Sequence, residues 1–96
     1  MEPHDEACVS EYLQLMTSYH KGLIDARSYQ SAYFSLMVKR IILTEEESRI
    51  LQQAYGDADD YDAELKLEYT IDEPELRARV SRSIAELIAL ENQPKL

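Results

Sequence analysis

The sequence predicts an all-α fold, a small antiparallel four-helix bundle that forms one domain over residues 1–96. Apolar residues recur in four segments at the i, i+3, i+4, i+7 spacing that places them on one face of a helix. Only two glycines and three prolines occur in the 96 residues, too few for the many tight turns of a β fold. Amphipathic helices joined by short links bury their apolar faces by packing together as a bundle.

The first predicted helix runs from about Asp5 to Lys21, and its apolar residues form one stripe of Val9, Tyr12, Leu13, Met16 and Tyr19. Gly22 ends it, because glycine readily adopts the left-handed conformation that closes many helices. The second helix extends to about Ile42 and begins at Asp25, whose carboxylate can accept a hydrogen bond from a backbone N–H of the first turn. Its stripe contains Tyr29, Ala32, Tyr33, Leu36, Met37 and Ile41, so we expect the four tyrosines of these helices to be buried or half-buried.

Thr44 and Glu47 predict the start of the third helix, since they match a capping box in which each side chain binds the other's free N–H. Its apolar face consists of Ile50, Leu51, Ala54 and Tyr55, and Gly56 is predicted to end it. Asp72 caps the last helix, with Pro74 in the first turn, where its missing N–H costs nothing. The stripe of this helix is Leu76, Val80, Ile84, Leu87 and Ile88, with burial ending near Leu90. We expect residues 1–5 and 92–96 to fray.

Negative charge is concentrated in one segment, which follows Gly56 and is predicted to open as a loop. Between residues 57 and 75 the chain holds nine acids and one base, so this segment carries eight of the nine net negative charges. Carboxylates this close repel one another, so such a segment is either well solvated or retained because a positive partner binds it. The acidic balance argues against nucleic acid or an anionic membrane as the direct partner.

Other features exclude several classes of protein. The longest apolar run is too short to span a bilayer, and the acidic N-terminus lacks the basic start of a signal peptide, so we expect a cytoplasmic protein. Cys8 is the single cysteine and cannot form an internal disulfide. The two histidines are His4 and His20, and no third group that would orient a His4–Cys8 pair is evident. We therefore predict no catalysis, no cofactor and no metal centre.

The acids from residue 57 onward allow three interpretations. They can form a solvated loop, or they can bind a divalent cation, since Asp57, Asp59 and Glu68 match positions 1, 3 and 12 of a calcium loop. Asp62 stands where such a loop needs glycine. They can also fill a basic cleft built for phosphates, because carboxylates and phosphates both present anionic oxygens to lysine and arginine. Tyrosines flank or interrupt the acids, as is common at protein interfaces: Tyr55, Tyr61 and Tyr69.

Three stretches of the chain resemble the immunity proteins of the colicin D type. They are Gly22-Leu23-Ile24-Asp25-Ala26 with Tyr29, then Tyr55-Gly56-Asp57-Ala58-Asp59-Asp60-Tyr61, and Glu68-Tyr69-Thr70-Ile71-Asp72-Glu73-Pro74-Glu75-Leu76-Arg77. The likeness covers roughly residues 8 to 90. Proteins of that type are small, acidic four-helix proteins that neutralise a tRNA-cleaving toxin domain, and related immunity proteins serve in contact-dependent growth inhibition.

The resemblance implies that the partner is a cognate basic nuclease domain, whose active-site cleft is covered so that tRNA is excluded. Carried over, the toxin-binding acids are Asp57, Asp59, Asp60, Asp62 and Glu64. Tyr55 and Tyr61 are our candidates for packed contacts beside them. We expect a monomer that binds the toxin one to one and binds neither nucleic acid nor membrane. Two alternatives stay open, a helical adaptor for another basic protein and a divalent-cation-binding module.

Overall fold

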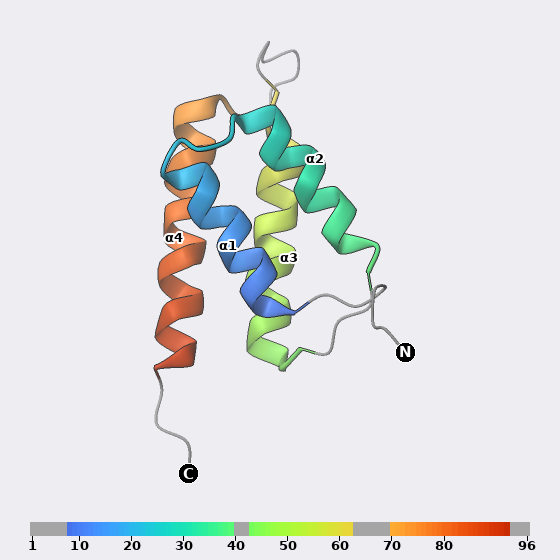
Figure 1. The fold of residues 1–96 in the computed structure, drawn as a ribbon, viewed down its shortest axis with the longest axis vertical. Helices are drawn as coiled ribbons and strands as arrows, with labels where there is room; N and C mark the ends of the chain where they lie inside the picture. Colours follow the sequence, from blue (N-terminus) through green and yellow to red (C-terminus); the bar gives the residue numbers. More distant parts are fainter. Residues whose placement is uncertain (1–7, 40–42, 63–69, 93–96) are drawn as a thin grey trace.

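A computed structural model describes residues 8–39, 43–62 and 70–92, and in this part of the chain it contains four helices. They are α1 (Val9–His20), α2 (Ala26–Met37), α3 (Glu45–Asp60) and α4 (Glu73–Glu91). The helices run alternately in opposite directions, and each packs against its chain neighbours, with α4 returning to α1 (Figure 1). The predicted antiparallel four-helix bundle is confirmed.

A row of tyrosines fills the space between α1 and α2. Tyr12, Tyr19, Tyr29 and Tyr33 are all buried, as their stripe positions predicted. Tyr19 stacks on Tyr29 with ring centroids 4.8 Å apart, and Tyr33 makes tilted contacts with Tyr29 and Tyr12 at 5.8 and 5.1 Å. Tyr33 also donates a 2.7 Å hydrogen bond to the carbonyl oxygen of Leu51, which joins this row to the middle of α3.

Three of the four helices begin at the capping side chains that the sequence predicted. The Oδ1 atoms of Asp25 and Asp72 accept hydrogen bonds from the N–H groups of Ser28 and Glu75, and Thr44 forms the full capping box with Glu47. Gly22 has φ of +82°, which an L side chain rarely adopts, and lies just beyond the end of α1. The first residues of the predicted first helix, before residue 8, lie outside the described part.

The prediction that Gly56 ends the third helix is wrong, because α3 continues to Asp60. Ala54 and Ala58 are both buried one turn apart, so packing against the core extends past the glycine. This burial outweighs the roughly 1 kcal/mol that glycine costs within a helix relative to alanine. The acids at positions 57, 59 and 60, expected in a loop, therefore form the last turn of α3.

Two further details differ from the expected stripes. α2 ends at Met37, short of Ile42, and Val38 beyond it is 85% exposed, so no core contact favours another turn there. Residues 40–42, and with them Ile41, lie outside the described part. In α4 the buried side is completed by Ser83, while Ile88 is 43% exposed and faces away from the core.

One end of the bundle collects the end of α3, the start of α4 and the turn between α1 and α2, at the top of Figure 1. We call it the acidic end; its described acids are Asp25, Asp57, Asp59, Asp60, Asp62, Asp72, Glu73 and Glu75. Tyr61 and Ile71 form an isolated bridge there. In it the N–H of Ile71 donates to the Asp60 carbonyl at 2.9 Å, and the N–H of Asp62 donates to the Ile71 carbonyl at 3.1 Å.

Candidate functional site

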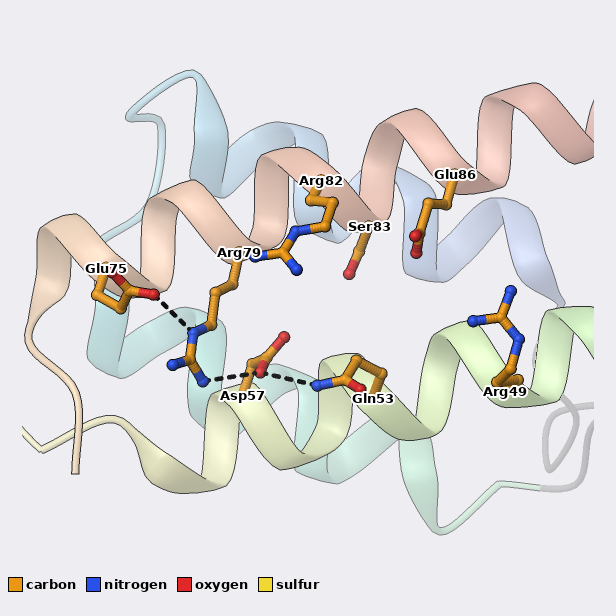
Figure 2. Close-up of a pocket in the computed structure, with 8 residues that line it drawn as sticks. All are labelled: Arg49, Gln53, Asp57, Glu75, Arg79, Arg82, Ser83 and Glu86. Atoms are coloured by element: carbon orange, nitrogen blue, oxygen red, sulfur yellow. Dashed lines mark hydrogen bonds and ion pairs between the residues drawn. The ribbon is translucent and has the colours of Figure 1, made fainter. Parts of the chain in front are cut away.

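Asp57 is buried and has a structural role. Its side chain is only 5% exposed, and its Oδ1 accepts a 3.2 Å hydrogen bond from Arg79 of α4 and a longer one, 3.4 Å, from Gln53. Arg79 also donates a 2.9 Å hydrogen bond to Glu75 (Figure 2). These two carboxylates, Glu75 first, raise the pKa of Arg79. A buried carboxylate needs such a partner, so Asp57 ties the last turn of α3 to α4.

Glu73 is also engaged within the fold. Its Oε2 accepts a 2.7 Å hydrogen bond from the buried hydroxyl of Tyr19 and pairs with Arg77. The guanidinium of Arg77 lies over the Tyr19 ring, 4.7 Å from its centroid, and donates to the carbonyl oxygens of Tyr19 and His20 at 2.9 and 3.0 Å. Arg77 thus gives the carbonyl of His20 a donor and adds a second donor to the carbonyl of Tyr19, which also accepts from the N–H of Gly22. Burial, followed by the Glu73 hydrogen bond, raises the pKa of Tyr19.

Asp59 and Asp60 differ from these acids. Asp59 is exposed, Asp60 is half-buried, and within the described residues neither carboxylate forms a hydrogen bond or an ion pair. Both lie in the last turn of α3, where the helix dipole disfavours negative charge, and that turn contains no basic residue. The fold therefore gains nothing from these two charges.

The exit from α3 is held in place by a side chain of α2. Gln30 donates hydrogen bonds to the carbonyl oxygens of Ala58 and Tyr61, at 2.8 and 3.2 Å. Tyr61 is half-buried and extended, and with Asp62 it lines a hollow of about 290 Å³ against Arg27, Gln30 and Ser31. The backbone around Asp59 and Asp60 is consequently fixed from both α2 and α4.

An aromatic pair, one ring from α2 and one from α3, lies on the outer side of these two helices. The rings of Phe34 and Tyr55 are 5.6 Å apart, and Tyr55 is 40% exposed. Tyr55 is one of the predicted site residues, whereas Phe34 and Gln30 were not predicted. Phe34 is the one phenylalanine of the chain and directly follows the buried Tyr33, which places it beside the core stripe; Gln30 had no recognisable sequence signal.

The chain matches the model of the bacterial self-protective colicin-like immunity family over residues 7–87. It belongs to this family. It matches none of the curated proteins and none of the solved structures with which it was compared. The chain is thus an immunity protein, and its expected partner is a toxin protein.

The sequence-predicted site of this immunity protein is brought together only in part. Four of the predicted residues lie at consecutive positions of the acidic end: Asp59, Asp60, Tyr61 and Asp62. Tyr55 lies one helical turn before Asp59. Asp57 is turned inward towards Arg79. Glu64 lies outside the described residues, as do Glu68 and Tyr69.

A metal centre gains no support from the described part of the immunity protein, which contains no group of three or more acids, histidines or cysteines placed to hold an ion. Asp57 and Asp59, two members of the possible calcium loop, lie in a regular helix. The helices within the described ranges also lack the length and apolar character needed to cross a membrane.

Proposed function

We propose that this immunity protein neutralises a tRNA-cleaving toxin by covering the toxin's basic active-site cleft with its acidic end. The observation that carries the proposal is the pair Asp59 and Asp60, two carboxylates that the described part of the fold leaves without partners at an unfavourable helix end. The free energy of unfolding of natural proteins is only about 5–15 kcal/mol, so charges that lower it are retained when they serve binding.

The surrounding contacts support the proposal because they make the acidic end rigid before binding. Arg79 fixes the turn against α4, and Gln30 fixes its exit against α2. A preorganised surface loses less conformational entropy on association than a flexible one. The carboxylates then stand in for the phosphates of the tRNA backbone, and the inhibitor needs no chemistry of its own.

Charge complementarity also sets the kinetics. A chain with net charge −9 is attracted to a basic nuclease, and such steering raises association rates to about 10⁸ M⁻¹s⁻¹ or more at low salt. We propose a one-to-one complex with a monomeric immunity protein in the cytoplasm of the producing cell, without direct contact to nucleic acid or membrane. The toxin belongs to a colicin or to a contact-dependent growth inhibition system.

The test reverses two charges at a time. Asp59→Lys with Asp60→Lys should abolish protection of cells that express the basic nuclease domain that we expect the gene immediately upstream to encode. The reversed charge at this turn then meets the toxin's cations in a desolvated cleft, at a cost of several kcal/mol. The fold should persist, since positive charge at the end of a helix is favoured by its dipole. Circular dichroism checks that the variant remains helical.

The matched control is Glu45→Lys with Glu46→Lys in the first turn of α3, which changes the net charge by the same amount. Both glutamates are exposed, and neither is the capping residue Glu47. This variant should lose stability, because lysine is disfavoured at the start of a helix, and yet it should protect cells. Equal protection by the two double variants would refute the proposed site.

A further inference from the structure

The acids in the last turn of α3 point to different neighbours. Asp57 faces α4, where it pairs with Arg79, and Asp60 follows it by three residues, so both lie on the α4 side of the helix. Tyr55 faces α2, where it contacts Phe34, and Asp59 follows it by four residues. Asp59 and Asp60 are therefore about 100° apart around α3, with Asp59 nearer to α2 and Asp60 nearer to α4.

The α3–α4 flank is a poor surface for a basic partner. A groove of about 340 Å³ runs between these helices, and its charged residues are three arginines and three acids: Arg49, Arg79, Arg82, Asp57, Glu75 and Glu86 (Figure 2). These charges balance, so the groove offers no net attraction. Arg49 and Arg82 are exposed and have no ion-pair partner among the described residues, so they would repel the toxin's cations.

The α2–α3 flank combines the opposite properties. We define the seam as Gln30, Phe34, Tyr55, Asp59, Tyr61 and Asp62, which join the outer sides of α2 and the end of α3. It presents aromatic rings beside carboxylates. Its neighbouring cations in the two hollows that Tyr61 lines are Arg27 and Arg77, and Arg77 is paired with Glu73. Arginine and lysine side chains bind such surfaces well, because the ring face attracts the cation, the carboxylate pairs with it, and the aliphatic stem covers the ring.

We propose that the toxin docks on the seam, with an arginine or lysine of its basic surface lying over the Phe34–Tyr55 pair and binding Asp59, while the α3–α4 groove stays outside the interface. This inference rests on the proposed function and adds the docking face. Exposed aromatic side chains next to charge are the residues that dominate the binding energy of many interfaces. The half-buried Phe34 supports Tyr55 from behind.

Single charge reversals test whether the toxin docks on the seam. The probe is the catalytically inactivated basic nuclease domain that we expect the gene immediately upstream to encode, and the dissociation constant of its complex is measured by calorimetry at physiological salt. Asp59→Lys should weaken binding by at least about 30-fold, because it places like charges in contact. Asp60→Lys should weaken it less, by at most about tenfold, because Asp60 lies towards α4 at the rim of the interface, where water and salt partly screen its charge. Equal losses, or a larger loss at Asp60, would overturn the proposal.

A second pair of variants tests the aromatic contact independently of charge. Tyr55→Ala should weaken binding about tenfold, whereas Tyr55→Phe keeps the ring and should bind nearly as well as the native chain. Ile88→Ala is the control, since Ile88 is exposed to a similar degree, 43% against 40%, but lies on α4. If Tyr55→Ala binds like Ile88→Ala while the double reversal at Asp59 and Asp60 abolishes binding, the seam is wrong and the proposed function stands. If the native chain fails to bind, both fall.

Discussion

Both ends of helix α3 are acidic, but the helix dipole favours negative charge at only one of them. In the first turn, Glu45, Glu46 and Glu47 lie where the helix dipole favours negative charge, and Glu47 also completes the capping box with Thr44. In the last turn, Asp57, Asp59 and Asp60 lie where the dipole opposes negative charge. The helix dipole thus favours acids at one end of α3 and opposes them at the other.

This contrast separates structural charge from functional charge. The fold compensates Asp57 by burying it against Arg79, and it compensates neither Asp59 nor Asp60 within the described residues. Counting acids in the sequence cannot make this distinction, because all three look alike there. Substitutions of these residues, and of the core residues beneath them, should therefore change stability to different degrees.

The largest effect is expected from the tyrosine core, which Tyr33 joins to the middle of α3. Burial raises the pKa of Tyr29 and of Tyr33 well above the ordinary value of 10.0. Above pH 10 the unfolded chain loses these protons while the folded chain keeps them, so the free energy of unfolding falls as pH rises. The expected loss is about 3 kcal/mol per pH unit for the two residues together.

Urea unfolding at pH 8, 10 and 11 measures this loss. Tyr29→Phe should reduce the slope above pH 10 by about a quarter to a third, because burial raises the pKa of Tyr12 and Tyr19 as well, and only one of these buried groups is removed. A slope that stays the same in this variant would show that Tyr29 does not contribute.

The next effect is confined to the last turn. Arg79→Ala leaves the Asp57 carboxylate buried with only the weaker bond from Gln53, and it should lower the free energy of unfolding by about 2 kcal/mol, less than for a fully buried pair because Arg79 is 30% exposed. The melting temperature should fall by roughly 10 °C. Arg82→Ala, in the same groove, is the control and should change stability by less than about 0.5 kcal/mol. Similar losses in both variants would mean that the Asp57–Arg79 pair adds no stability.

The smallest effect is expected when one charge is removed from either end of α3. Glu46→Gln should lower the free energy of unfolding and Asp59→Asn should raise it, each by about 0.3–1 kcal/mol, because the helix dipole favours one charge and opposes the other. The difference should shrink in high salt. Denaturation of both variants at low and high salt measures it, and shifts of the same sign would remove the physical basis of the contrast.

Helix type, order and most caps were predictable from the sequence, because apolar period and capping side chains are local signals. Asp25, Thr44 and Asp72 cap as predicted, and the four tyrosines are buried. The end of α3 was not predictable from local signals, since Gly56 indicates a stop. Only the three-dimensional packing of Ala58 against the core extends the helix to Asp60.

The candidate site was predictable as a segment but not residue by residue. Charge density located the acidic end, yet the partner of Asp57 lies 22 residues away on α4, a distance that no local pattern encodes. The clamp formed by Gln30 and the contact of Phe34 with Tyr55 likewise depend on how α2 packs against α3. Such contacts between helices decide which acids remain available to a partner.

The central claim is that the toxin binds the last turn of α3 and not the first. The most direct measurement is an NMR titration of the isotopically labelled immunity protein with the catalytically inactivated basic nuclease domain that we expect the gene immediately upstream to encode. The backbone amide signals of residues 59–62 should shift or broaden strongly, while those of residues 45–47 should stay unchanged. Strong changes at residues 45–47, with residues 59–62 unaffected in a saturated complex, would contradict it.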